Sequence, residues 1–561
     1  MHFDARLSRI AQGLERAELV LKNGRVLDTN TGEIYPGDVA VEGGLVVGVG
    51  EYAGREEIDL GGRLLCPGFV DAHLHLESCL ANPAELVLEA ARHGTLAFIV
   101  DPHEVANVAG GAGIAYLMEC LKGVPADVYV QMPSCVPALP GENNGGAFRA
   151  ADMAPFLGDP RVLGLGEVMD LPAVLEARED MLDKLRLFEN RPIDGHGGFL
   201  RGGALNAYAL AGISSDHECV DFDAALQEAR AGLRILVRQG SAARNLESIV
   251  SGLVASGVDS SAFCFCTDDK HIRDIRREGH IDHNVRASLA LGLPLIQAVQ
   301  MASRNAAQHY GLRHLGAITP GKAANLLVVD DRDGFVVERA LYRGRPVESW
   351  PLPEKPACPD ELLHTVRLAE LGPDPFAMAD GPAAVIEVVP GQILTKLRQE
   401  RLPGLRGRFQ PDGTYSKAAV LERHRASGNI GLAAVKGFGI RGGAIAATMG
   451  HDSHNLIVLG DNDRDMRLAV EELVRCQGGY VLVEDGYVAG CLPLPAMGLL
   501  SLQGASTVDQ TLDALIRKAH QMGVPEGIEP FVTLAFLPLP VLPEARLTDR
   551  GLLDVTAGRY L

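Results

Sequence analysis

Between about residues 64 and 310, short apolar runs that end in polar clusters alternate with longer stretches of helical periodicity. Such apolar runs are typical of parallel strands covered on both faces, and the helical stretches are the connections that parallel strands need. Eight of these runs occur, which is the number required for one complete (β/α)₈ barrel, or TIM barrel. We expect the strands at Gly68–His75, Thr95–His103, Asp127–Pro133, Val162–Asp170, Pro192–His196, Gly212–His217, Arg234–Gln239 and Ala262–Asp269.

The two flanks of this region have a different pattern. From about Glu18 to Leu65, short apolar or alternating runs are separated by glycine-containing turns, which is typical of antiparallel strands. Strand-like runs return at Ala323–Val329 and Gly334–Val347. We expect both flanks to combine into one small split β-sandwich. Ahead of it, Met1–Leu19 carries charged and apolar residues at helical spacing and predicts a short amphipathic helix.

A proline-rich stretch, Trp350–Pro356, precedes a C-terminal α/β region. Its predicted strands include Ala444–Met449, Leu456–Leu459 and Tyr480–Val483. A chain of 561 residues is too long for one core, so the predicted fold class is α/β with several domains. The expected boundaries are 1–63 for the N-terminal helix and first sandwich part, 64–312 for the barrel, 313–350 for the rest of the sandwich, 351–360 for a linker and 361–561 for a C-terminal α/β domain.

Five of the eight predicted strands end in side chains that can bind a metal ion. His73 and His75 alternate along the first strand and therefore point to the same side. Active sites of such barrels lie at the carboxyl ends of the strands, so these side chains should converge. A single histidine at a strand end is usually a surface or hydrogen-bonded residue, but recurrence on five strands predicts a metal site. The six residues are His73, His75, Glu167, His196, His217 and Asp268.

Four imidazoles and two carboxylates exceed what one catalytic ion with open positions requires. They suit two ions bridged by a carboxylate and a hydroxide, because two cations lower the pKa of the bridging water. Nitrogen and oxygen ligands are compatible with Mn²⁺, Fe²⁺ or Zn²⁺ and do not distinguish them. Asp269 follows Asp268 directly, and we expect its side chain to point the other way.

Charge and composition narrow the partners. The formal net charge of −20 argues against nucleic acid, because phosphate binding needs a basic face, and it favours a small neutral substrate. No run of about 18 uncharged apolar residues occurs, so no membrane span is expected. Ten scattered cysteines without a Cys-x-x-Cys pair predict reduced thiols in a cytoplasmic protein. For an enzyme of this size the expected assembly is a homodimer.

One motif and several shorter segments carry a family resemblance. Residues 67–75 read Pro-Gly-Phe-Val-Asp-Ala-His-Leu-His, and with the flanking split sandwich they resemble the amidohydrolase superfamily. Within it, the chain resembles the bacterial adenine deaminases that use two metal ions, over most of its length. The segments that carry this second resemblance are Leu74–Ser78, Val100–Glu104, Gly166–Met169, Cys266–His271, Gly428–Gly431 and His451–Asn455.

The resemblance implies hydrolytic deamination of adenine to hypoxanthine and ammonia, in purine salvage. The bridging hydroxide would attack C6, and Asp268 would carry its proton to the departing amine.

Dihydroorotases and hydantoinases have a carboxylated lysine where this sequence has Glu167, which disfavours those branches. The family's metals would be Mn²⁺ or Fe²⁺, with Zn²⁺ as the alternative. The implied ligands are His73, His75 and Asp268 for one ion and His196 and His217 for the other, with Glu167 as the bridge and, like Asp268, a catalytic residue.

Residues beyond the second and third strands are candidate substrate contacts. His103 and Glu104 follow the second strand and are candidates for an extra acid or a purine-binding group, with a simple turn as the alternative. Asn143 and Asn144 lie in the loop after the third strand. They have the hydrogen-bonding groups to bind a purine edge, although asparagine-rich loops are commonly turns.

A polar loop in the C-terminal region supplies two further candidates. Residues 451–455 directly follow an apolar predicted strand and include His451 and His454. We expect this loop to close over the barrel mouth, where it would bind substrate or exclude water. The alternative is a solvated loop with both histidines exposed.

Two other functions stay open. An amidohydrolase acting on another aminopurine or on a cyclic amide would share the barrel and the metal ligands. A non-catalytic, hydantoinase-like scaffold is the second, but such a protein is expected to have lost some metal ligands, and here all six positions are filled.

Three short segments resemble nucleotide-binding or nucleotide-modifying motifs, but the residues around each one do not fit that function. Gly437–Gly442 matches the dinucleotide pattern but precedes a strand-like run instead of a helix. Gly316–Lys322 nearly matches a P-loop, but Ala323 stands where Ser or Thr would hold Mg²⁺. His75-Leu76-Glu77 resembles the zinc motif of cytidine deaminases, but no Pro-Cys-x-x-Cys completes it.

Overall fold

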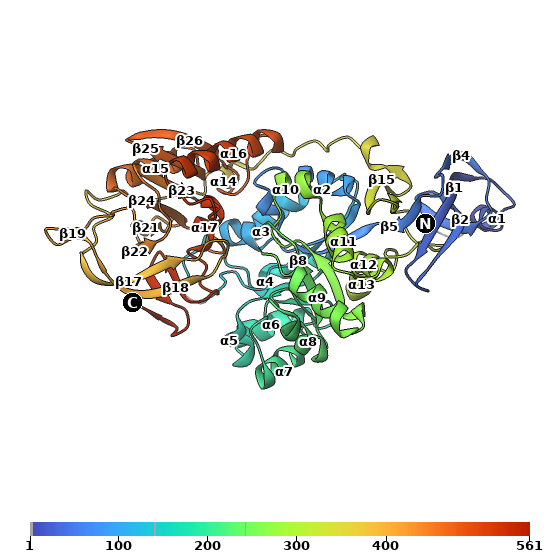
Figure 1. Cartoon of the computed structure of the whole chain (residues 1–561), viewed down its shortest axis with the longest axis horizontal. Coiled ribbons are helices and arrows are strands. Elements are labelled where there is room, and N and C mark those ends of the chain that lie inside the picture. The colour runs from blue at the N-terminus through green and yellow to red at the C-terminus, as the bar shows by residue number, and fades with distance from the viewer. Residues whose placement is uncertain (1–3, 140–141, 242) are drawn as a thin grey trace.

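The computed structural model describes residues 4–139, 142–241 and 243–561 (Figure 1). The N-terminal β-structure lies at one end, the barrel in the middle and the C-terminal α/β part at the other end. Within the described residues, no helix is both long and apolar enough to cross a membrane.

Both flanks of the barrel contribute strands to one eight-stranded sheet, in the order β16-β15-β14-β5-β1-β2-β3, with β4 beside β1. The antiparallel pair of β5 (Leu64–Pro67) and β14 (Leu326–Asp330) joins the flanks. Buried residues from both flanks share a core, so the predicted combination of the flanks is confirmed. The other strands are β1 (Ala17–Asp28), β2 (Glu33–Glu42), β3 (Leu45–Gly50), β4 (Gly54–Asp59), β15 (Val336–Tyr342) and β16 (Arg345–Pro346).

The N-terminal helix is shorter than predicted. Helix α1 spans Ala5–Ala11, and the Asp4 side chain caps it by accepting from the Leu7 backbone N–H at 2.8 Å. Gly13 has a φ of 73°, which ends the helical path. The apolar residues that follow belong to β1. Residues 1–3 of the predicted helix lie outside the described residues.

All eight predicted barrel strands are present, and neighbouring strands pair in parallel. Two backbone hydrogen bonds complete the ring: Ser214 N–H to the Ile193 carbonyl (2.8 Å) and Asp268 N–H to the His73 carbonyl (2.9 Å). The strands are shorter than predicted because their polar ends belong to the loops at the barrel mouth. They are β6 (Phe69–Leu74), β7 (Thr95–Val100), β8 (Asp127–Met132), β9 (Val162–Val168), β10 (Ile193–Gly195), β11 (Ser215–Asp216), β12 (Arg234–Arg238) and β13 (Phe263–Cys266).

Helices form the outer layer of the barrel (Figure 1). Each amphipathic helix buries one face, as in α2, where leucine, valine and alanine residues are buried against the barrel. The helices are α2 (Pro83–Arg92), α3 (His103–Cys120), α4 (Ala150–Met153), α5 (Leu171–Leu175), α6 (Glu179–Leu187), α7 (Gly202–Leu210), α8 (Phe222–Arg230), α9 (Leu246–Ser256), α10 (Ile272–Glu278), α11 (Ile281–Ala290), α12 (Leu295–Ala302) and α13 (Arg304–His309).

The C-terminal part is built on a second eight-stranded sheet, in the order β18-β17-β22-β21-β24-β23-β25-β26. Its three predicted strands are present as β23 (Gly443–Ala447), β24 (Leu456–Gly460) and β25 (Gly479–Glu484). The Gly437–Gly442 motif is a connection between two strands, as expected. The other elements of this sheet and its helices are β17 (Gly381–Val388), β18 (Thr395–Leu402), β21 (Tyr415–Leu421), β22 (Ile430–Lys436), β26 (Tyr487–Pro493), α14 (Asp360–Leu363), α15 (Asp463–Arg475), α16 (Ala505–Gln521) and α17 (Pro530–Phe536).

The C-terminal part packs on the barrel of its own chain. Arg276 on α10 forms an ion pair with Asp509 on α16 (Nη1–Oδ2, 2.6 Å). Glu85 on α2 accepts at 2.8 Å from the backbone N–H of Ala505, the first residue of α16. The first N–H groups of a helix have no partner within the helix and favour a negative charge, so Glu85 caps α16 from the barrel.

Replacing Glu85 with alanine should weaken this docking. The loss of a capping acceptor lowers the free energy of unfolding by about 1 kcal/mol. Chemical denaturation or thermal unfolding measures the change. Glu119→Ala is the matched control, because Glu119 is exposed on α3 and forms a surface ion pair with Lys122 (2.6 Å). Equal stability of the two variants would contradict the capping role.

Candidate metal centre

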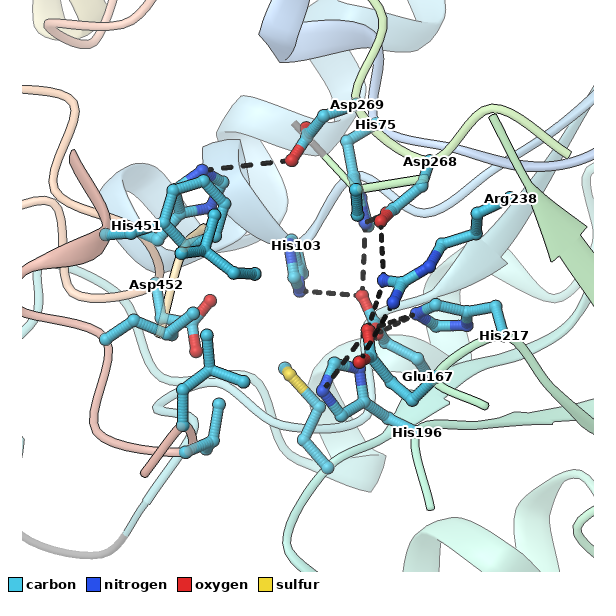
Figure 2. A pocket seen from close by; sticks show the side chains of 18 residues that line it. His75, His103, Glu167, His196, His217, Arg238, Asp268, Asp269, His451 and Asp452 are labelled. Atoms are coloured by element: carbon cyan, nitrogen blue, oxygen red, sulfur yellow. Dashed lines mark hydrogen bonds and ion pairs between the residues drawn. The ribbon is translucent and has the colours of Figure 1, made fainter. Parts of the chain in front are cut away.

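A cavity opens at the carboxyl ends of the barrel strands (Figure 2). Side chains from the barrel line one side, and side chains from the C-terminal part line the other. On the C-terminal side the wall is largely apolar. The lining there consists of Ile393, His451, Asp452, Phe536, Leu539, Val541 and Leu542.

His73 and His75 come from the end of β6, and their rings meet edge to face with centroids 4.7 Å apart. His75 donates from Nδ1 to the Asp101 backbone carbonyl at 2.9 Å, which leaves Nε2 free to face the cavity. That Nε2 lies 3.1 Å from Asp268 Oδ1 and 3.2 Å from Glu167 Oε1. The alternation along the strand thus aims both rings at the same two carboxylates.

Glu167 lies between two groups of imidazoles. Its Oε1 faces His75, whereas its Oε2 lies 2.6 Å from His196 Nδ1 and 3.2 Å from His217 Nε2 (Figure 2). His217 in turn stacks on His73, with ring centroids 4.1 Å apart. One carboxylate therefore contacts imidazoles from strands on both sides of it, which is the arrangement of a bridging ligand.

The backbone around Glu167 is built for this placement. The Glu167 N–H donates to Asp101 Oδ2 at 2.8 Å. A β-carbon at Gly166 would overlap the Asp101 carboxylate, so only glycine fits before Glu167. Asp101 thereby fixes the strand end that carries the Glu167 carboxylate.

Asp268 and Asp269 point in different directions, as their alternation predicts. Asp268 has a φ of 62°, and its backbone bonds to both His73 and His75 close the barrel at this point. Its Oδ1 faces the two histidines. Asp269 instead faces His451, with Oδ2 3.8 Å from Nε2.

The donor set fits divalent cations. His73 is 1% exposed, and within the described residues its Nε2 has no hydrogen-bond partner. Burial raises the pKa of Glu167, but His196 and His217 outweigh it and hold that pKa well below its ordinary value. Burial lowers the pKa of His196, yet Glu218 and Glu167 raise it to about 10. The ionised carboxylates thus favour positive charge in this cluster, and bound metal cations would provide that charge. Three overlapping groups place their ligand atoms within 4.8 Å of one another: His73, His217 and Asp268; His73, His75 and Glu167; and Glu167, His196 and His217.

The candidate substrate contacts divide into two pairs. His103 stacks on His75 at 4.4 Å and lines the cavity together with His451. Glu104 and His454 lie behind them: Glu104 contacts His451 through Oε1 (2.8 Å to Nδ1) and His454 Nε2 through Oε2. His454 does not line this cavity, so the geometry gives it a positioning role. The loop is buried over the barrel mouth, and the alternative of two exposed histidines is wrong.

The two asparagines do not line the cavity. Asn144 donates to Asn107 Oδ1 at 2.6 Å, and Asn143 donates to Asp549 Oδ2 at 2.7 Å. Both side chains are used in contacts within the protein, so their expected contact with a purine is not supported. The sequence showed a polar loop but gave no direction for its side chains.

An arginine and a glutamate that the sequence did not single out also lie in the cavity wall. Arg238, at the end of β12, lies 3.0 Å from Asp268 Oδ2 through Nη1 and makes a two-pronged ion pair with Glu218. Glu218 Oε1 also lies 3.6 Å from His217 Nε2. Both residues stand at the carboxyl ends of predicted strands, and that position was the available signal.

Known families match both parts of the chain. The model of the amidohydrolase family matches residues 64–347, and that of the adenine deaminase C-terminal domain matches residues 392–559. The chain is 48% identical over 558 residues to "Adenine deaminase" of Desulfitobacterium hafniense (strain Y51), covering 99% of this chain and 98% of the relative. It is 42% identical to "Adenine deaminase 2" of Carboxydothermus hydrogenoformans, with coverage of 98% and 97%. A third relative, "Adenine deaminase" of Geobacillus kaustophilus (strain HTA426), is 41% identical, with coverage of 97% and 96%.

These similarities run from the barrel through the C-terminal part that closes it, and they include the segments that supply the buried histidines and carboxylates. The resemblance expected from the motif at residues 67–75 is confirmed. The chain belongs to the adenine deaminases of the amidohydrolase family.

Proposed function

We propose that this protein catalyses the hydrolytic deamination of adenine to hypoxanthine and ammonia. The observation that carries the proposal is that the similarity to relatives named adenine deaminase spans the whole chain, including the C-terminal loop that lines the cavity. A shared barrel alone would leave the substrate open, because unrelated reactions use the same fold.

We assign the buried cluster to two divalent ions. His73, His75 and Asp268 would hold one ion, His196 and His217 would hold the other, and Glu167 would bridge them. Ions bound there lower the pKa of a coordinated water and polarise the substrate. The nitrogen and oxygen donors suit Mn²⁺ or Fe²⁺, with Zn²⁺ as the alternative.

Asp268 is the proton carrier in this proposal. Its Oδ1 faces the histidine cluster, and its Oδ2 is held by Arg238 at 3.0 Å. Glu218 fixes Arg238 from the other side. The carboxylate is therefore oriented before substrate binds, and it can take a proton from the attacking water and deliver it to the departing 6-amino group.

The C-terminal part closes the site. His451 stacks on Phe536 with ring centroids 4.1 Å apart, and Leu539, Val541 and Leu542 extend this apolar wall. Such a wall excludes water and strengthens the electrostatic interactions inside the cavity. His103 lies on the barrel side and would contact the ring of the substrate. Assembly as a homodimer and a cytoplasmic location stay predictions from the sequence.

Metal-replete enzyme should release ammonia from free adenine and form hypoxanthine. Ammonia is measured with a coupled assay, and hypoxanthine is identified by chromatography. A chelator should abolish turnover, and Mn²⁺ should restore it. If metal-replete enzyme leaves adenine unchanged but acts on another aminopurine or a cyclic amide, the substrate assignment is wrong and the reaction class stands. Inactivity on all of them would favour the scaffold function.

Glu167→Gln should reduce the metal content. The substitution keeps the size of the side chain but removes the charge that would bridge two ions, so bound metal should fall from about two ions per chain to one or fewer. Elemental analysis after dialysis measures this. Chelation should lower the melting temperature of the wild-type protein by more than that of the variant, because a bound ligand stabilises the folded state. Glu119→Gln is the surface control, and metal content unchanged by Glu167→Gln would refute the bridge.

His451→Ala should lower kcat/KM for adenine by roughly tenfold to a hundredfold, because it removes a partly buried side chain of the cavity wall that is paired with Glu104. Steady-state kinetics measures the effect. His364→Ala is the control, since His364 is largely exposed. Kinetics unaltered by His451→Ala would exclude a role of the loop in closing the site.

A further inference from the structure

Asp452 is a buried carboxylate with one unpaired oxygen among the described residues. It is 2% exposed and lines the cavity that contains the histidine cluster (Figure 2). Within the described residues, its Oδ2 meets no hydrogen-bond donor. Burial raises the pKa of Asp452 to about 7, and the nearby Glu104 carboxylate adds to the shift. A buried acceptor left unpaired costs free energy, so its retention calls for a partner that comes from outside the protein.

The neighbours of Asp452 in the same loop are held by contacts with other parts of the chain, although His454 Nδ1 has no hydrogen-bond partner within the described residues. His451 and His454 both contact Glu104, and the Ser453 carbonyl accepts from His424 Nε2 at 2.7 Å. Asn455 donates to the Asn143 carbonyl at 2.8 Å. These contacts fix the loop on both sides of Asp452, so its carboxylate is held toward the cavity.

The backbone of the loop is unusual at this position. Asp452 has a φ of 65° and His454 a φ of 49°, both in the left-handed region that L-residues rarely adopt. Backbone conformations of this kind are concentrated at ligand-binding sites, where the surrounding contacts hold them. Here those contacts are the engaged residues on either side of Asp452.

We propose that Asp452 accepts a hydrogen bond from the N–H of the imidazole ring of the purine and thereby selects the free base over its nucleoside. This proposal rests on the proposed function. The reacting C6 must lie beside Glu167 and Asp268 on the barrel side, whereas Asp452 stands on the C-terminal side of the same cavity (Figure 2). The edge of the substrate that faces Asp452 is then the edge opposite the reacting amine.

The chemistry of the two substrates explains the selection. A carboxylate oxygen accepts hydrogen bonds, and a free purine base offers an N–H on its five-membered ring. A nucleoside carries a sugar on that ring and lacks the N–H. It would leave Asp452 unpaired and would push a polar sugar against the apolar wall of Phe536, Leu539 and Leu542.

The test compares adenine with 9-methyladenine, in which a methyl group blocks the ring nitrogen. Wild-type enzyme, Asp452→Asn and Asp452→Ala are assayed on both. For Asp452→Ala we expect KM for adenine to rise roughly tenfold to a hundredfold with a smaller change in kcat, since a bond to a charged acceptor is lost. The preference for adenine over 9-methyladenine in kcat/KM should fall at least tenfold. Asp452→Asn keeps a weaker acceptor and should lie between.

Binding and stability supply readouts besides turnover. Calorimetry with hypoxanthine should show weaker binding by both variants. Neither variant should lose thermal stability, because the substitution removes an unpaired buried charge. Asp485→Asn is the matched control: Asp485 shares the left-handed backbone (φ 48°) but is exposed.

The outcomes separate this proposal from the proposed function. If wild-type enzyme does not deaminate adenine, the proposed function fails before Asp452 is tested. If wild-type enzyme is active and Asp452→Ala keeps the wild-type preference for adenine over 9-methyladenine, the role of Asp452 is overturned. A variant that unfolds at a lower temperature and loses activity on both substrates equally would mark Asp452 as structural, which also overturns it.

Discussion

The buried carboxylate of Glu167 is the constraint on which the rest of the site depends. It is 2% exposed, and its two oxygens face imidazoles from opposite sides, with Oε1 3.2 Å from His75 Nε2 and Oε2 3.2 Å from His217 Nε2. An ionised carboxylate in the interior is stable only where positive charge or donors surround it. The barrel meets this demand by bringing ring nitrogens from separate strand ends to one point, and Gly166 and Asp101 hold that point fixed. Because the buried carboxylate needs positive charge around it, the same cluster is suited to bind cations.

A second buried carboxylate, Glu104, ties the C-terminal part to the barrel. Its oxygens contact His451 and His454, so a barrel helix and a loop more than 300 residues later share one charge cluster. Removing one partner of a buried pair is costly because the other is left uncompensated, commonly by about 3–5 kcal/mol. The loop is therefore held over its own barrel mouth by charge as well as by packing. This explains why its apolar neighbours, Phe536 among them, form a fixed wall of the cavity.

The sequence predicted the parts of the site that follow from periodicity. Strand alternation and the order of strands around a barrel fix the direction of His73, His75 and their counterparts, so this cluster of candidate metal ligands could be anticipated. The two-residue periodicity of strands does not predict which contacts the side chains beyond the strand ends make. Asn143 and Arg238 illustrate this: the asparagine looked like a purine contact and binds within the protein, whereas the arginine looked like an ordinary strand residue and holds Asp268. The length of α1 was overestimated for a related reason, since Ala17 and Leu19 fit one face of a strand as well as a helix.

One loop thus combines satisfied and unsatisfied polar groups, and the contrast between them is informative. His451 and His454 are both held by Glu104, although His454 Nδ1 has no hydrogen-bond partner within the described residues. Asp452 lies between them in a left-handed backbone and faces the cavity. Within the described residues its Oδ2 has no hydrogen-bond partner, and the nearby His451 offsets only part of its desolvation. Natural proteins tolerate such local costs where function requires them, while the surrounding structure supplies the stability. The tight contacts of its neighbours are the reason why the fold can hold this one carboxylate unpaired until a ligand with a donor arrives.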